Sequence, residues 1–169
     1  MKTQELAVLS LRPDPSHPLG LDLKHILAAL QRDIPDWVWC VKNLDWLGEN
    51  GESLCNAVQA AGPGGFWFDS QDLVKVVKGI YQTVEGEFIA FPRSIDRRAL
   101  GPQDLSLSSF PSSRAVAAIV AVDGCYFDVY SKDSQATSRL HETFPGATVE
   151  DPPSFISSSV AAGGGRFAK

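Results

Sequence analysis

The segment that most constrains the fold lies in the second half of the chain, where a tight-turn dipeptide joins two strand-like runs. Residues 115–122 read Ala-Val-Ala-Ala-Ile-Val-Ala-Val, and Asp123-Gly124 separates them from Cys125-Tyr-Phe-Asp-Val-Tyr. An Asp-Gly pair between such runs is typical of a two-residue β-hairpin, and a first arm that is apolar throughout predicts a strand covered on both faces. Alternation in the second arm predicts two sets of side chains: Cys125, Phe127 and Val129 toward the core, and Tyr126, Asp128 and Tyr130 away from it.

Two other segments have the periodicity of amphipathic helices. In residues 23–34, apolar side chains recur at the i, i+3, i+4 and i+7 positions of one helix face. Residues 73–84 repeat this pattern, with Asp69 or Ser70 as the expected N-cap and Gly86 as the stop signal.

The remaining elements are expected to be shorter. Residues 43–65 should form a loop that contains one short element, and 92–113 a long connection that is either functional or mobile. A last helix is expected to begin at Asp133 or Ser134 and to extend to Phe144. Further strands are expected at 5–11, 37–41, 66–68, 87–91 and near 147–149.

This order of elements predicts the α+β class. We expect a single domain, a mixed β-sheet with about three helices packed on it, and a β-hairpin in the C-terminal half. The 169 residues, 44% of them hydrophobic, are enough for one core without a metal or a disulfide. The domain is expected to cover 1–156, and 157–169, with its three consecutive glycines, is expected to be a disordered tail.

The N-terminus does not have the pattern of a secretory signal, because polar residues interrupt its apolar positions before Arg12. The longest near-continuous apolar run, 115–122, is far shorter than the ~20 residues that a membrane-spanning helix needs. We therefore expect a cytoplasmic protein that binds no membrane. Cys40, Cys55 and Cys125 are expected to be free, buried thiols.

The charge balance and the absence of catalytic motifs exclude several classes of function. The formal net charge is -5, whereas proteins that neutralise nucleic-acid phosphates need a basic excess. The chain has neither the Gly-x-Ser-x-Gly of a nucleophile elbow nor a P-loop sequence, and His17, His25 and His141 have no zinc-binding spacing. We therefore expect no nucleic-acid partner, no catalytic residue, no metal site and no cofactor.

One segment is a candidate surface for a protein partner. In Asn43-Leu-Asp-Trp-Leu-Gly-Glu-Asn, the indole of Trp46 stands among acidic and turn-forming residues. An exposed contact role and a core role are both open for this indole, whereas Trp37 and Trp39 are expected in the core. Aromatic side chains ringed by charge are common in protein interfaces. The residues expected to form the partner-binding surface are Asp45, Trp46, Glu49 and Glu52.

The long connection carries a second candidate site. Arg93, Arg97 and Arg98 form a local concentration of positive charge, and their paired donors suit a phosphate or a carboxylate. A solvated loop, with these arginines paired to Asp96 and Asp104, is the other interpretation. This cluster supports the alternative hypothesis of an enzyme or a small-molecule sensor with its site near the loop.

Four short segments resemble those of a known family: Trp37-Val-Trp, Phe68-Asp-Ser-Gln-Asp-Leu-Val-Lys, Phe88-Ile-Ala-Phe-Pro and Cys125-Tyr-Phe-Asp-Val-Tyr-Ser-Lys-Asp. With the order of elements, they make residues 6–149 similar to a family of uncharacterised bacterial proteins, a domain of unknown function. The resemblance implies a small bacterial cytoplasmic protein and supplies no active-site residues. The acidic α+β form also resembles, at fold level alone, immunity proteins that neutralise bacterial toxins. The leading hypothesis is therefore a non-enzymatic, immunity-like binding protein.

Overall fold

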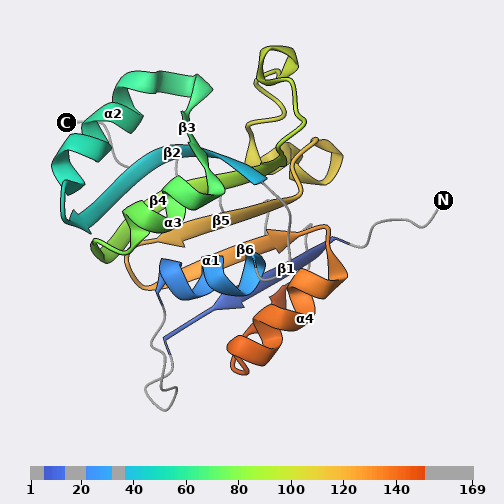
Figure 1. Cartoon of the computed structure of the whole chain (residues 1–169). Coiled ribbons are helices and arrows are strands. Elements are labelled where there is room, and N and C mark those ends of the chain that lie inside the picture. The colour runs from blue at the N-terminus through green and yellow to red at the C-terminus, as the bar shows by residue number, and fades with distance from the viewer. Residues whose placement is uncertain (1–5, 14–21, 32–36, 151–169) are drawn as a thin grey trace, which may run out of the picture.

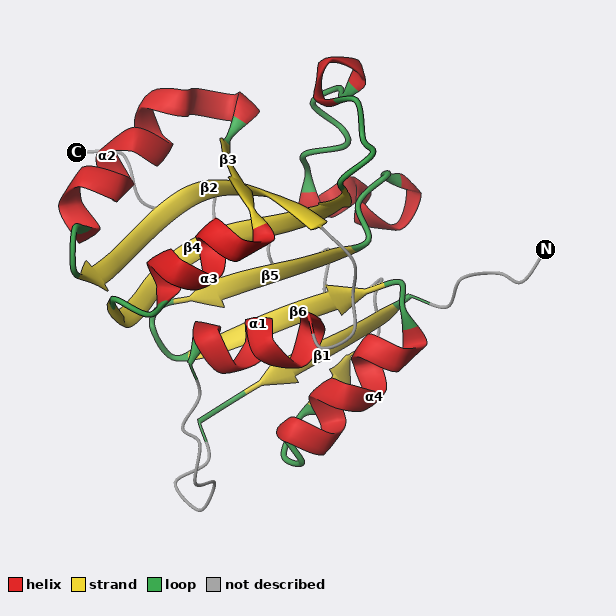
Figure 2. Ribbon diagram, viewed as in Figure 1, coloured by secondary structure: helices red, strands yellow, loops and turns green. Residues whose placement is uncertain are grey.

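The computed structural model describes residues 6–13, 22–31 and 37–150, which contain one seven-stranded sheet and four α-helices (Figures 1 and 2). The strands lie in the order β3-β2-β4-β5-β6-β1-β7. Their bounds are β1 Ala7–Leu11, β2 Trp37–Gly48, β3 Phe66–Asp69, β4 Ile80–Pro92, β5 Ala117–Val122, β6 Tyr126–Ser131 and β7 Thr148–Glu150. The helices are α1 Leu23–Gln31, α2 Gly51–Ala61, α3 Ser70–Val77 and α4 Ser134–Thr143.

The α+β class expected from the sequence is confirmed, and the strand pairing is simpler than expected. Every strand pair in the described part of the chain is antiparallel, where a mixed sheet was expected. The expectation of a parallel pair came from the helical crossovers. The strands that α1 connects, β1 and β2, are not neighbours, because β4, β5 and β6 lie between them.

The predicted hairpin forms, with a turn one residue longer than expected. β5 pairs with β6 from Ala117↔Ser131 to Val122↔Tyr126, which leaves Asp123, Gly124 and Cys125 in the turn. Asp123 and Gly124 both have positive φ, 51° and 63°, a conformation that favours glycine and is tolerated by aspartate. Phe127 and Val129 are in the main core, but Cys125 is exposed in the turn, so its expected core position is wrong.

One face of the sheet, here called the helix face, is covered by α1, α3 and α4 (Figure 1). Trp37 and Trp39 lie in this core as expected, with ring centroids 5.8 Å apart. Ser70 joins the strand to the start of α3, because it accepts a hydrogen bond from Trp39 Nε1 (3.2 Å) and donates one to the Trp37 carbonyl (2.7 Å). The expected N-cap, Asp69, precedes this helix.

The opposite face, here called the loop face, is covered in part by the long connection between β4 and β5. Leu105 and Phe110 from this connection pack in a second core cluster with residues of the central strands. Two lysines hold the connection down through its own backbone: Lys42 Nζ donates to the Leu105 carbonyl (2.5 Å) and Lys132 Nζ to the Ser113 carbonyl (2.6 Å). The 92–113 segment is therefore a structural cover with two short 3₁₀ helices.

Two boundaries differ from the expected ones. The helix expected over 73–84 ends at Val77, and its last apolar positions belong to β4 instead. The chain turns at Gly79, which packs so closely against Gly48 that a Cβ on Gly48 would lie 2.3 Å from the Gly79 carbonyl oxygen. The 43–65 segment is not a loop, because β2 continues to Gly48 and α2 follows. The expectations for residues 32–35, His17 and 157–169 lie outside the described residues.

The apolar stripe of α3 supplies a test of the packing. Val77 is 1% exposed, so we expect Val77→Asp to lower the free energy of unfolding by about 3–5 kcal/mol, because an unpaired charge would be buried. Its exposed neighbour Lys78 should tolerate alanine within about 0.5 kcal/mol. Urea unfolding followed by tryptophan fluorescence measures both variants. An unchanged midpoint for the aspartate variant would contradict this assignment of the buried face.

Candidate functional site

The expected partner-binding residues lie around the first turn of α2, and the structure separates the indole from the carboxylates. Asp45, Glu49 and Glu52 are exposed, but Trp46 is only 3% exposed. Its indole lies beneath Gly51, where an added Cβ would be 3.4 Å from Trp46 Cδ1 and 3.7 Å from Nε1. Of the two roles left open for Trp46, the structure has the core role, because β2 continues through this residue and turns it toward the helix face. Trp46 is therefore not a surface contact residue.

A bulge in β2 reorganises the polar side chains at this end of the sheet. Asn43 has a φ of 51°, and the pairing of β2 with β4 shifts register between Lys42 and Asp45. Around the bulge, Glu87 accepts a hydrogen bond from Asn43 Nδ2 (2.8 Å). It also forms an ion pair with Lys42, whose Nζ lies 3.3 Å from the carboxylate. Bulges often re-aim side chains next to functional sites. Here the bulge produces a fixed cluster of one cation, one carboxylate and one amide.

This cluster lies at a cleft of about 1020 Å³, here called the bulge cleft. The cleft opens where β3 has ended beside β2, between α2 and the 102–106 part of the long connection. Its volume is near the upper end of the range usual for ligand sites. Polar and reactive groups in its lining are Lys42, Asn43, Asp45, Cys55, Gln59, Glu85 and Ser106.

Two carboxylates of the bulge cleft stand opposite each other. Asp45 on β2 and Glu85 on β4 are register partners, and both are exposed. No ion pair involves either carboxylate within the described residues. Like charges placed directly across a strand pair destabilise it. The arrangement is therefore unfavourable for folding and favourable for binding a cation.

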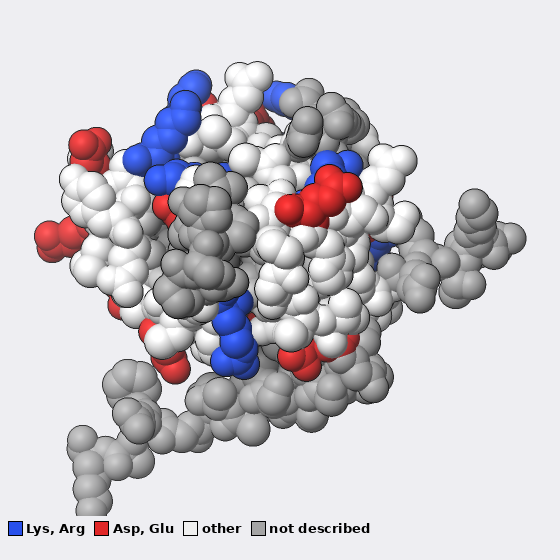
Figure 3. All heavy atoms as spheres, turned by 90° about the horizontal axis from the view of Figure 1, so that it is seen from below, with Lys and Arg blue, Asp and Glu red and all other residues white. Residues whose placement is uncertain are grey.

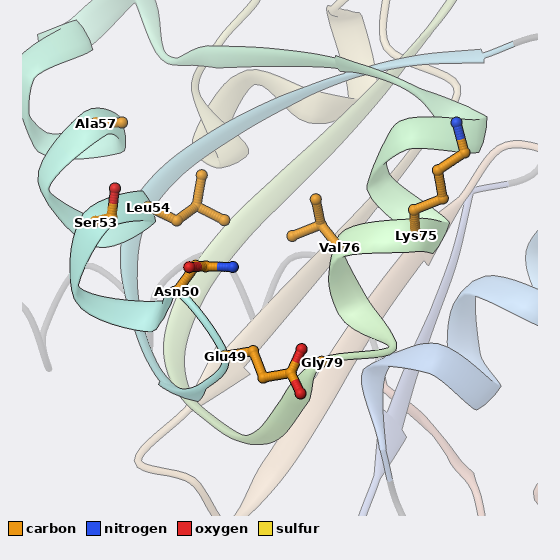
Figure 4. A pocket seen from close by; sticks show the side chains of 8 residues that line it. All are labelled: Glu49, Asn50, Ser53, Leu54, Ala57, Lys75, Val76 and Gly79. Carbon is orange, nitrogen blue, oxygen red and sulfur yellow. The ribbon is translucent and has the colours of Figure 1, made fainter.

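A second, smaller cleft of about 400 Å³, here called the helix cleft, lies between α2 and α3 (Figure 4). Leu54 and Val76 point toward each other from its two sides, and the side chain of Asn50 extends into the space beneath them. The carboxylate of Glu49 stands at one end, close to Gly79. The expected site residues Asp45 and Glu49 thus line two different clefts, with α2 between them.

Two large apolar side chains are exposed at the same end of the sheet. Leu47 is 56% exposed on β2, and Tyr81 is 80% exposed on β4. They lie near each other in the pairing, because Leu47 is the partner of Gln82. The sequence analysis missed these two residues and Glu85, since it placed Leu47 in a loop and Tyr81 on a helix. The signal that was available was the return of strand alternation at Leu44 and Trp46 after Asn43.

The arginine cluster of the long connection is largely engaged with other groups. Arg93 and Arg97 both contact the Asp69 carboxylate, at 3.3 and 3.9 Å, and Arg97 stacks on the ring of Trp67. Arg98 engages Asp96 through its backbone, because its N–H donates to the Asp96 carboxylate (3.0 Å). The structure therefore brings two of the three expected anion-binding arginines together, on a carboxylate of their own chain.

Arg114, farther along the same connection, pairs with Asp104. Arg114 Nη2 lies 3.0 Å from Asp104 Oδ2 and also donates to the Ala99 carbonyl. Hydrogen bonds from Arg114 and from the Gly101 backbone lower the pKa of Asp104 to about 2. On the molecular face shown in Figure 3, basic and acidic side chains are interspersed, and neither sign forms a continuous area.

Two buried titratable groups lie away from the clefts. Burial raises the pKa of the Cys40 thiol to about 12, so this thiol is not a nucleophile near neutral pH. On the loop face, burial also raises the pKa of Asp128 to about 6, although a hydrogen bond with Ser10 lowers it. Asp128 is the register partner of Ser10 on β1, and the nearby Glu150 raises its pKa further.

Within residues 6–13, 22–31 and 37–150, no group of three or more His, Cys, Asp or Glu side chains is placed to hold a metal ion. No helix in these ranges has both the length and the hydropathy to cross a membrane. No family model, no curated protein and no solved structure matches the chain. The resemblance to uncharacterised bacterial proteins therefore stays a prediction.

The opposed carboxylates make a prediction about stability. We expect Asp45→Asn to raise the free energy of unfolding by a few tenths of a kcal/mol at low salt, because it removes a like-charge contact with Glu85. The gain should shrink at high salt, which screens exposed charges. Glu52→Gln is the matched control, because it removes the same charge from the first turn of α2, where a negative charge is favourable. Equal effects of the two variants in urea unfolding would contradict the repulsion.

The buried carboxyl of Asp128 predicts a pH dependence. A carboxyl whose pKa is raised in the folded state contributes stability that is fully present below its unfolded pKa of about 4 and is lost as the pH rises through about 6. Asp128→Asn removes this loss, so we expect it to gain about 1–2 kcal/mol relative to wild type between pH 4 and pH 7. Thermal unfolding across this range measures the difference. Parallel pH profiles for both proteins would contradict the assignment.

Proposed function

We propose that this chain is a cytoplasmic, non-enzymatic binding protein that recognises a basic segment of a partner protein. The recognition surface is the end of the sheet where β2 and β4 meet α2. The observation that carries the proposal is the opposition of Asp45 and Glu85, two exposed carboxylates without a cation partner in the described part of the chain. A partner's lysine or arginine would relieve their repulsion as it binds.

The electrostatic argument concerns the difference between the free and the bound protein. In the free protein the two carboxylates repel each other across the strand pair. A cation placed between them adds two attractions, which outweigh the repulsion that remains. Glu49 and Glu52 add negative charge at the same end of the molecule, which attracts a basic partner over about one Debye length.

Exposed apolar groups supply the short-range part of the interaction. Tyr81 and Leu47 take the place that the sequence analysis had given to Trp46. Tyrosine is one of the residues most enriched in binding hot spots, because it combines a large contact area with a polar hydroxyl. The acidic groups and the exposed apolar side chains at this end of the sheet thus supply long-range attraction and short-range contact area.

Two lining residues of the bulge cleft, Lys42 and Asn43, are held in place by contacts to Glu87. Glu87 is held by both Lys42 and Asn43, and Lys42 is also bonded to the Leu105 carbonyl. Side chains that are already fixed lose little conformational freedom on binding. An immunity-like role, in which the basic partner is a toxin, is a narrower form of the same proposal.

Selection of random short peptides displayed on phage against the immobilised full chain tests the proposal. We expect the selected peptides to share a lysine or arginine beside an apolar residue. We expect the double variant Asp45→Asn/Glu85→Gln to bind these peptides about tenfold more weakly at low salt. Most of this loss should come from a lower association rate constant. Glu142→Gln, which removes a charge from the exposed side of α4, is the control and should change binding less than twofold.

Two results would overturn the proposal. One is the absence of any basic consensus among the selected peptides. The other is a loss of binding in Glu142→Gln that is as large, per charge removed, as in Asp45→Asn/Glu85→Gln, because the net charge alone would then explain the attraction. Tyr81→Ala adds a separate measurement: it should chiefly speed dissociation, since the ring acts only at short range.

A further inference from the structure

We infer that the helix cleft between α2 and α3 is a subsite for an arginine side chain. The inference rests on the proposed function, in which the partner is basic, and it specifies which residue of that partner enters the protein. The cleft has apolar walls and one charged end, which matches a side chain with an apolar stem and a cationic head.

The walls suit the stem. Leu54 and Val76 face each other across the cleft, with Ala57 farther along α2 (Figure 4). Leu54 and Val76 are only partly buried, although both pack against the main core. An aliphatic stem between them would cover apolar surface that is now exposed to water. The cleft volume of about 400 Å³ leaves room for a side chain and part of the peptide that carries it.

The charged end suits a cation. The carboxylate of Glu49 has no ion pair within the described residues, and its Oε2 lies 3.5 Å from where a Cβ on Gly79 would stand. The backbone is fixed there, because the Glu49 N–H donates to the Gly79 carbonyl (2.9 Å). The C-terminal end of α3 lies beside the same point, and the negative end of the helix dipole also favours positive charge.

The one lysine of the lining does not neutralise this end. Lys75 Nζ is paired with Asp72 at 3.0 Å, and its side chain points away from Glu49 (Figure 4). The net free charge of the cleft is therefore that of the Glu49 carboxylate. This charge complementarity assigns the cleft to a cation and disfavours an anionic or purely apolar occupant.

The Glu49 carboxylate favours arginine over lysine. A guanidinium presents its N–H donors in a planar fork that can bond both oxygens of one carboxylate, whereas an ammonium is a single point charge. Asn50, the next residue, has a left-handed backbone, with φ 56° and ψ 17°, and its amide nitrogen points into the cleft. Asparagine tolerates this backbone conformation better than most residues, which explains its presence at a position that also begins a helix.

Titration of the isotope-labelled full chain with N-acetyl-arginine amide, followed by amide NMR shifts, tests the inference. We expect saturable shifts at Leu54, Val76 and Gly79, with weak affinity. Glu49→Gln should weaken binding by about five- to tenfold, because it removes a charge-assisted hydrogen bond. Glu52→Gln removes an equal charge one turn away, outside the cleft, and should change affinity less than twofold. N-acetyl-lysine amide should bind several-fold more weakly, and N-acetyl-norleucine amide should not saturate.

Three results would overturn the inference: no saturable shift at these amides, equal weakening by Glu49→Gln and Glu52→Gln, or equal affinity for the norleucine or the lysine compound. None of them depends on Asp45 or Glu85. If arginine amide fails to bind while the selected peptides still require Asp45 and Glu85, the subsite fails and the proposed function stands. If arginine amide binds in the cleft and no basic peptide is selected, the proposed function fails and the cleft remains an arginine site.

Discussion

The long pairing of β2 with β4 is the constraint on which the rest of this molecule depends. It extends from Trp37↔Pro92 to Gly48↔Ile80, and it carries both hydrophobic clusters on its two faces. The bulge at Asn43 interrupts it midway, and bulges increase the local twist of a strand pair. Beyond the bulge, β2 has no strand on its outer side, and α2 packs beside it instead (Figure 1). Both clefts arise from this replacement of a strand by a helix.

The two faces of the sheet are covered by different means. Regular helices bury the helix face through periodic apolar stripes, which need few specific contacts. The loop face is covered by an irregular connection, whose backbone carbonyls must find donors. Lys42 and Lys132 supply such donors at two points. The ion pair between Arg114 and Asp104 joins two parts of the connection to each other. A segment rich in serine and proline can therefore act as a fixed part of the fold.

The sequence predicted those elements whose signals are local. The hairpin depends on Asp123-Gly124, and the alternation of Phe127 and Val129 depends only on neighbours in the strand, so both were found. The end of α3 was missed because residues 73–84 satisfy the helix period throughout. What ends the helix is the close approach of Gly79 to Gly48, a contact between residues far apart in the chain.

The candidate site was only partly predictable for the same reason. The acidic residues Asp45, Glu49 and Glu52 could be identified from the sequence, because charged side chains are almost always exposed. Their division between two clefts, and the pairing of Asp45 with Glu85, arise from the register of β2 and β4. The pairing register cannot be predicted from the local sequence pattern once a bulge has shifted it.

Burial of Trp46 and exposure of the carboxylates around it have one physical origin. Strand alternation turns Trp46 toward the core and its neighbours Asp45 and Leu47 toward solvent. The indole gives α2 a large apolar surface to pack on, and Gly51 lets the first turn of the helix approach it closely. A helix fixed in this way positions Glu49 and Asn50 on one side and Cys55 on the other. Trp46 thus fixes the first turn of α2, and through this helix it helps to position the residues that line the two clefts.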